Sequence, residues 1–210
     1  MTKPVVSSAE FSGTARSAIH RGCTVVLIDD ISPSPSSGLV IAAEHVTTTQ
    51  MATIIQQSSG FVEICMDFPT ARRLGVPPMS GTDFLDYESS AVRKLWGVAV
   101  DAAHGITTGI SAADRANTAR VIATRTSTPE DLVRPGHLMP VLIPESAIQT
   151  PRSLVASAIA LVRAAGCGPA AVCSELVSSL DPAAMAGTDE AEIFARADGL
   201  PTVRLSELGY

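Results

Sequence analysis

Residues 104–140 read HGITTGISAADRANTARVIATRTSTPEDLVRPGHLMP, and this stretch holds the densest cluster of polar and special-backbone residues in the chain. Gly105 and Gly109 bracket Thr107 and Thr108, a spacing that predicts a tight loop with free backbone N–H groups and two hydroxyls. Such a loop is suited to hold an anion or an oxygen-rich substrate. We therefore predict that Thr107 and Thr108 bind substrate.

A helix and a turn follow this loop. Ser111 is placed to open a helix, and Asp114 stands at the acidic position of a capping box. Further on, Pro135 fixes one φ and Gly136 frees the next, so we expect His137 to be presented at a defined kink. A plainer interpretation stays open, in which two ordinary turns flank a surface helix.

The composition is that of a globular protein. The chain has 210 residues, of which 46% are hydrophobic and 17% charged, which suits one domain with a sizeable core. Its net charge is −6 and it has no run of lysine or arginine, so we expect neither nucleic acid nor a membrane as a partner. The chain has no apolar run of the ~18 residues that a membrane span needs, and its first residues lack the apolar core of a signal peptide.

The four cysteines are Cys23, Cys65, Cys167 and Cys173. They form no CxxC pair and lie in apolar sequence, so their spacing does not match a zinc site. We expect four buried, reduced thiols in a cytoplasmic protein, with no metal and no other cofactor.

Hydrophobic periodicity, caps and turn residues predict alternating helices and strands. Helices are expected at residues 8–22, 47–60, 67–73, 150–166 and 188–199, with another beginning at Ser111. Thr150 would cap the very apolar helix that follows it, with Pro151 at the first helical position. Strands are expected at residues 23–28, 39–43, 61–66, 95–100, 138–143, 170–176 and 202–205. Residues 31–38 are rich in serine and proline and predict a mobile or extended surface loop, whereas residues 83–94 show no clear pattern.

HGITTGISAADR followed by RPGH resembles the signature of the 3,4-dihydroxy-2-butanone 4-phosphate synthase family. Four further segments are similar to the same family in the same order: VVLIDD at 25–30, LVIAAEHVTTTQMATIIQQSSGFV at 39–62, RRLGVPPM at 72–79 and VCSEL at 172–176. The resemblance covers nearly the whole chain. It implies a single α/β (α+β) domain over residues 1–210, with a mixed sheet and surrounding helices. It also implies a small-molecule substrate and a homodimer with active sites shared between subunits.

The resembled enzymes convert ribulose 5-phosphate to 3,4-dihydroxy-2-butanone 4-phosphate and formate in riboflavin biosynthesis. Their active-site loop carries charges that are missing here. By alignment, a substrate-binding arginine falls on Pro33, a metal-binding glutamate on Ser34, a second glutamate on Ser36 and a substrate-binding aspartate on Gly38. Because Mg²⁺ needs carboxylate oxygens or waters held by them, serine is a poor replacement.

A second departure lies at the start of the helix near residue 150. The family has a phosphate-binding arginine and threonine here, with a metal-binding histidine between them. The aligned residues are Pro151, Val155 and Leu154 respectively. Arg152 is one position away from the arginine and is a partial substitute for it. We therefore expect no metal ligands in this chain.

Two acid/base positions of the family are kept, at His137 and Glu175. Glu63 stands where the family often has an active-site cysteine, in an otherwise apolar strand; such an acid is either exposed or functional. We predict His137, Glu175 and Glu63 as catalytic residues. The predicted substrate-binding residues are Asp29, Asp30, Thr107, Thr108, Arg134 and Arg152.

Three functions remain open on this evidence. The first is a divergent enzyme that uses metal-independent acid/base catalysis, as a lyase, isomerase or cyclase, on a less polar substrate without phosphate. The second is the authentic synthase reaction on ribulose 5-phosphate. The third is a non-catalytic binding protein on this fold.

Overall fold

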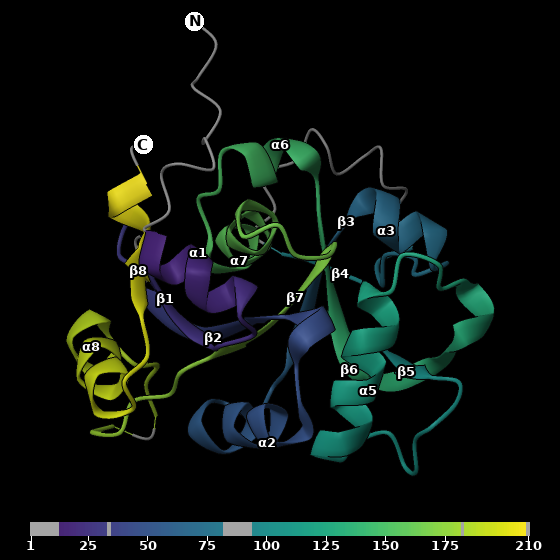
Figure 1. Ribbon diagram of the computed structural model, residues 1–210, viewed down its shortest axis with the longest axis horizontal. Helices are drawn as coiled ribbons and strands as arrows, with labels where there is room; N and C mark the ends of the chain where they lie inside the picture. Colours follow the sequence, from purple (N-terminus) through teal and green to yellow (C-terminus); the bar gives the residue numbers. More distant parts are fainter. Residues whose placement is uncertain (1–12, 33–34, 82–93, 182, 209–210) are drawn as a thin grey trace, which may run out of the picture.

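The computed structural model describes residues 13–32, 35–81, 94–181 and 183–208. Its centre is one mixed eight-stranded sheet with the order β4-β6-β3-β7-β2-β1-β8, and β5 pairs with β6 off this path. Helices lie on both faces of the sheet (Figure 1). This confirms the expected fold class.

The strands are β1 Val25–Asp29, β2 Ser36–Ala42, β3 Glu63–Asp67, β4 Leu95–Trp96, β5 Val100–Ala102, β6 Leu132–Ile143, β7 Ala170–Glu175 and β8 Thr202–Arg204. The α-helices are α1 Gly13–His20, α2 Thr48–Gln57, α3 Phe68–Arg73, α5 Ala112–Ala123, α6 Glu145–Gln149, α7 Leu154–Ala164 and α8 Thr188–Ala197. Short 3₁₀ turns occur at η1 Ala43–His45, η2 Pro129–Asp131 and η3 Leu205–Leu208. β3 runs parallel to β6 and β1 parallel to β8, and the other pairings are antiparallel.

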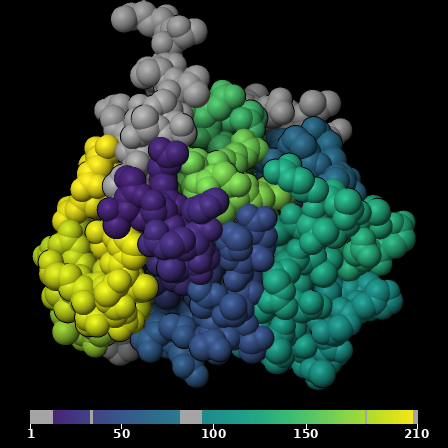
Figure 2. Space-filling model, viewed as in Figure 1, coloured from purple at the N-terminus to yellow at the C-terminus, as the bar shows by residue number. Residues whose placement is uncertain are grey.

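The sheet separates two hydrophobic cores. α1 and α7 bury their apolar residues against one face, whereas α2, α5 and α8 cover the other. α7 is buried along most of its length, as expected for a helix with apolar residues on nearly every side. Segments from the two ends of the described chain lie side by side on the surface in Figure 2, with α1 in purple and α8–β8 in yellow. No helix among the described residues is both long and apolar enough to cross a membrane.

The helix predicted at residues 150–166 begins later than expected, at Leu154, and a separate short helix, α6, precedes it. Ser153 is the N-cap of α7, and its hydroxyl accepts the backbone N–H of Ala156. Thr150 instead ends α6, where its hydroxyl donates to the carbonyl of Ser146. Pro151 disfavours a helical conformation at the residue before it, so the chain breaks there and the cap moves to Ser153.

The loop predicted at residues 31–38 is shorter than expected. β2 already begins at Ser36, which pairs with Asp29 across the β1–β2 hairpin, and Gly38 lies between Leu27 and Glu175. The serine and proline content therefore predicts a loop where β2 begins, although β2 pairs with β1 on one side and with β7 on the other. Residues 33–34, and all but the last residue of the unassigned segment 83–94, lie outside the described residues.

The cysteine prediction is confirmed at Cys65, Cys167 and Cys173, which are buried free thiols, but it is wrong at Cys23. Gly22 turns the chain with a φ of +76°, and the exposed Cys23 precedes β1, whose residues face the core. The apolar residues that follow Cys23 in the sequence belong to β1.

Gly136 is required for close approach and not for a special φ. β6 runs continuously through this residue, and Gly136 is not among the glycines with positive φ. A Cβ atom here would lie 2.0 Å from the carbonyl carbon of Val100 and 2.3 Å from the nitrogen of Asp101. The pairing of β5 with β6 shifts register between Val100 and Asp101, so the local irregularity that the sequence predicts is present, together with tight backbone packing at Gly136.

Gly136→Ala is therefore expected to lower the free energy of unfolding by roughly 3 kcal/mol or more, because backbone atoms cannot yield as side chains do. Urea titration followed by circular dichroism measures this. Gly13→Ala is the control, since a Cβ atom at Gly13 meets no described residue within 4 Å, and we expect it to change stability by less than about 0.5 kcal/mol. Equal stability of the two variants would contradict the close approach.

Candidate functional site

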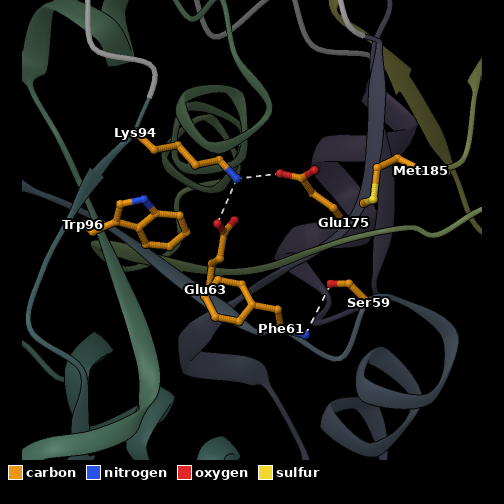
Figure 3. A pocket seen from close by; sticks show the side chains of 7 residues that line it. All are labelled: Ser59, Phe61, Glu63, Lys94, Trp96, Glu175 and Met185. Carbon is orange, nitrogen blue, oxygen red and sulfur yellow. Dashed lines mark hydrogen bonds and ion pairs between the residues drawn. The ribbon is translucent and has the colours of Figure 1, made fainter. Parts of the chain in front are cut away.

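A pocket of about 260 Å³ opens at the end of the sheet where β3 begins and β7 ends. Figure 3 shows the side chains that line it, which are Ser59, Phe61, Glu63, Lys94, Trp96, Glu175 and Met185. Glu63 pairs with Cys173 on the antiparallel β7. Because side chains alternate along a strand, Glu175 projects from the same face as Cys173 and Glu63.

Lys94 lies between the two carboxylates. Its Nζ is 2.8 Å from Oε1 of Glu63 and 2.5 Å from Oε1 of Glu175, and both interactions are drawn in Figure 3. The same ammonium lies 5.5 Å from the centre of the Trp96 ring, a distance at which a cation is attracted by the face of an indole. Phe61 packs edge-on against Trp96 with ring centroids 5.6 Å apart. The pocket is therefore acidic at its base and aromatic at its side.

The three charged groups differ in burial, and their pKa values reflect this. The side chain of Glu63 is 3% exposed, whereas those of Lys94 and Glu175 are each 25% exposed. Burial raises the pKa of Glu63, and the attraction of Lys94 opposes that shift. Burial alone would lower the pKa of Lys94, but the two carboxylates together outweigh it and hold the pKa above its ordinary value. Oε2 of Glu63 is buried without a hydrogen-bond partner among the described residues.

His137 forms a second polar pair with Asp101. The backbone N–H of His137 donates to Oδ1 of Asp101 at 2.9 Å, and its ring Nδ1 lies 2.7 Å from Oδ2. The Asp101 side chain is 6% exposed and the imidazole 42% exposed. With Nδ1 engaged, the ring has a fixed orientation and Nε2 is its remaining polar atom.

Gly109 makes room for this pair. It has a φ of +89°, and a Cβ atom there would lie 2.0 Å from Oδ2 of Asp101 and 2.6 Å from Nδ1 of His137. Strand register also relates His137 to the pocket, because Met139 pairs with Glu63. His137 precedes Met139 by one strand repeat, so it lies on the Glu63 face of the sheet.

The loop before α5 uses its N–H groups internally. The carboxylate of Asp114 accepts the backbone N–H groups of Thr107 and Gly109 and the hydroxyl of Thr107. Ser111 caps α5 as expected, by accepting the N–H of Asp114. The acid thus serves the preceding loop instead of closing a capping box. Thr108 is exposed. The carboxylate of Asp114 takes the place of the anion that the sequence predicts for this loop.

The other predicted substrate-binding residues do not line the pocket. Asp29 accepts hydrogen bonds from the backbone of Ile31 and Ser32, and Asp30 accepts from Ser206. These two acids therefore hold the C-terminal end of β1 in place.

The two predicted arginines also lie outside the pocket lining. Arg134 donates to the backbone carbonyls of Leu74, Pro129 and Leu132, and Arg152 is exposed. The guanidinium of Arg134 therefore holds neighbouring turns together.

Two residues that the sequence analysis aligned with metal- and phosphate-binding positions of the resembled family lie in apolar surroundings. Leu154 and Val155 are each 3% exposed, at the start of α7 and inside the core. A Cβ atom at Gly38 would lie 2.7 Å from Cδ2 of Leu154, so the leucine fills the space above the β2 backbone. Gly38 is paired with Glu175, so the Leu154 side chain lies beside the pocket.

Sequence reasoning missed Lys94 and the aromatic side of the pocket. Residues 83–94 show no clear pattern, so the sequence does not single out Lys94. One signal was available: a carboxylate such as Glu63 in a buried strand requires a partner, and Lys94 stands directly before an apolar strand.

Among the described residues, Glu44, His45 and Cys167 form a cluster of ligand types whose atoms lie within 4.8 Å of one another. Its groups already have protein partners. Glu44 accepts the backbone N–H of Gly168 at 2.9 Å, and the Cys167 thiol donates to the carbonyl of Ile19 at 3.8 Å. These contacts tie the turn before β7 to η1 and α1.

The thiol in this cluster predicts a loss of stability in alkaline solution. Burial, with a smaller contribution from Glu44, raises the pKa of Cys167 from 9.0 to about 11. The unfolded chain therefore releases this proton first, so the contribution of Cys167 to stability is complete below pH 9.0 and lost toward pH 11. Urea unfolding under reducing conditions should show a smaller loss across this window for Cys167→Ala than for the wild type. Cys23→Ala, at the exposed cysteine, is the control, and a loss unchanged in Cys167→Ala would refute the assignment.

Comparison with known proteins identifies relatives of the whole chain. The model of the 3,4-dihydroxy-2-butanone 4-phosphate synthase family matches residues 13–209. The synthase of Chromobacterium violaceum is 34% identical over 194 residues, which cover 92% of this chain and 89% of that protein. Riboflavin biosynthesis protein RibBA of Mycobacterium tuberculosis is 36% identical over 190 residues. This match covers 90% of the chain but only 44% of the longer relative.

Solved structures agree in fold. A 3,4-dihydroxy-2-butanone 4-phosphate synthase in complex with two magnesium ions has a TM-score of 0.83 and 32% identity, with 93% of each chain covered. The synthase of Candida albicans has a TM-score of 0.81 and 31% identity, again with 93% of each chain covered. The two-domain RibBX of A. baumannii has a TM-score of 0.82 and 29% identity, and the match covers 93% of this chain and 55% of that one.

Proposed function

Because this chain belongs to the 3,4-dihydroxy-2-butanone 4-phosphate synthase family, we propose that it is an enzyme that transfers protons at a carbon next to a carbonyl group. The observation that carries the proposal is the Asp101–His137 pair, in which a buried carboxylate holds an exposed imidazole. An acid/base residue needs this combination of fixed orientation and access to substrate.

His137 and Glu175 take the acid and base roles in this proposal. Nδ1 of His137 is bound to Asp101, so Nε2 is the atom that exchanges a proton with the substrate. Oε1 of Glu175 accepts a hydrogen bond from Lys94, and the Glu175 side chain is 25% exposed. Its Oε2 is then the atom that faces a substrate carbon or hydroxyl.

The comparisons favour the synthase reaction itself as the first activity to test. Relatives that carry this name share 34% identity over nearly the whole of both chains. A hydroxylated ketone such as ribulose 5-phosphate also suits two acid/base groups, because the reaction begins by removal of a proton beside the carbonyl. On this reading the products are 3,4-dihydroxy-2-butanone 4-phosphate and formate.

The residues of this chain do not fit the magnesium ions held by one of the solved relatives. The two carboxylates of the pocket converge on the Lys94 ammonium, and a divalent cation at that point would meet a positive charge. The Leu154 and Val155 side chains offer no ligand atom. We therefore derive no step of the reaction through a metal.

A second candidate is a related reaction on a less polar carbonyl compound without phosphate. It is supported by Phe61, Trp96 and Met185 in the pocket lining and by the buried Leu154 and Val155 nearby. Apolar walls with a few polar groups are typical of sites for partly apolar ligands. The proton-transfer residues are the same in both candidates, so one experiment tests the shared chemistry and separates the substrates.

That experiment measures exchange of the protons beside the carbonyl with deuterated water, by NMR, and formate release in parallel. The substrates are ribulose 5-phosphate, ribulose and an aromatic hydroxyketone, each with and without Mg²⁺. We expect exchange with the wild type, and at least a roughly 100-fold loss in His137→Asn and in Glu175→Gln. His20→Asn and Asp198→Asn are the controls, since both residues are exposed and outside the pocket lining.

The outcomes separate the three functions. Formate from ribulose 5-phosphate assigns the synthase reaction, and exchange confined to the substrates without phosphate assigns the second candidate. Absence of exchange with every substrate would overturn the proposal and favour a non-catalytic binding protein.

Asp101→Asn tests whether Asp101 positions His137. The amide Oδ1 still accepts the backbone N–H of His137, but its NH₂ group faces Nδ1 and makes that nitrogen an acceptor. Nε2 then carries the proton. We expect a fall in kcat of about 100-fold with little change in KM, together with a change of ring tautomer visible in ¹⁵N NMR. A kcat equal to that of the wild type would show that Asp101 has no positioning role.

A further inference from the structure

The Lys94 cluster has the layout of a cation site. Glu63 begins β3, Glu175 ends β7 and Lys94 precedes β4, so three separate segments bring two negative charges around one positive charge. Figure 3 shows both carboxylates pointing toward the same Nζ atom. The cluster keeps a formal charge of −1 when all three groups are ionised, and it lies within the pocket lining.

The lysine is placed to remain an ammonium. A lysine that acts as a nucleophile must lose its proton, which requires a lowered pKa. The two carboxylates have the opposite effect on Lys94 and raise its pKa. An ammonium has three N–H donors, of which two are directed to Glu63 and Glu175. Within residues 13–32, 35–81, 94–181 and 183–208, the third donor has no acceptor, and the ammonium lies beside the Trp96 ring.

The partners of this ammonium are those that a hard divalent cation also takes. Mg²⁺ and Mn²⁺ bind proteins through one or two carboxylates and complete their shell with water. Oε2 of Glu63 is buried without a hydrogen-bond partner among the described residues, so the site contains more acceptor atoms than the lysine satisfies. Removal of the lysine would leave two converging carboxylates with no counter-charge.

We propose that Lys94 is the built-in cation of this pocket: its ammonium takes the place between Glu63 and Glu175 that a divalent metal ion would occupy, and its third N–H donates to an anionic oxygen of the substrate. Because the charge is attached to the chain, the site does not depend on metal concentration. The contact with substrate rests on the proposed function, whereas the exclusion of metal from this site does not.

The test measures Mn²⁺ binding by titration calorimetry and by electron paramagnetic resonance, without any substrate. We expect the wild type to bind no Mn²⁺ at the pocket. Lys94→Ser should bind one Mn²⁺ at least tenfold more tightly than the wild type, and the second substitution Glu175→Gln should abolish that binding. Mn²⁺ should also raise the Tm of Lys94→Ser and leave the Tm of the wild type unchanged.

Arg204→Ser is a matched control, because Arg204 also lies between two carboxylates, those of Glu192 and Asp30, outside the pocket lining. We expect it to gain no comparable binding, which would separate the pocket from a general effect of charge. Lys94→Arg keeps the positive charge and should exclude Mn²⁺ as the wild type does.

Two results would overturn the proposal. One is Mn²⁺ binding by the wild type that Glu175→Gln abolishes, since the lysine would then be displaced by metal. The other is a folded Lys94→Ser that binds no Mn²⁺. If Lys94→Ser does not fold, Lys94→Gln, which has an uncharged side chain one atom shorter than that of lysine, is measured in its place. Loss of proton exchange with intact metal exclusion would count against the proposed function alone.

Discussion

β3 lies between β6 and β7, and this double pairing is the constraint on which the pocket depends. Glu63, the first residue of β3, is flanked by Met139 on one side and Cys173 on the other. The carboxylate is therefore held away from water, where an unpaired charge costs several kcal/mol. Lys94 supplies the opposite charge, and Glu175 joins the pair because β7 carries it past Cys173 on the same face.

The Asp101–His137 pair obeys a different constraint, the close packing of β5 against β6. Gly136 allows the two backbones to approach, and Gly109 leaves space above the carboxylate. Asp101 is buried and the imidazole is exposed, so one partner is fixed while the other meets solvent. In the Glu63–Lys94–Glu175 cluster, by contrast, the two carboxylates share one ammonium.

Features encoded over a few residues were predicted well from the sequence. Thr47 and Gln50 form a capping box at the start of the helix predicted at residues 47–60, and the Ser111 cap forms as expected, because both partners lie within one helical turn. Prediction failed where two local solutions competed. Thr150 and Ser153 are both good caps, and the position of Pro151 decided between them. The carboxylate of Asp114 can accept N–H groups either at the start of its own helix or in the preceding loop, and it accepts those of the loop.

The sequence by itself determined the family, the mixed sheet and most of its helices, because these follow from motifs and from periodic burial that every segment carries locally. It also singled out His137, Glu175 and Glu63. The tertiary structure decided their partners. Lys94 is 31 residues from Glu63 and 81 from Glu175, and Asp101 is 36 residues from His137. A pairing between such distant residues leaves no period or spacing in the sequence, since only the register of the strands brings the charges within reach of each other.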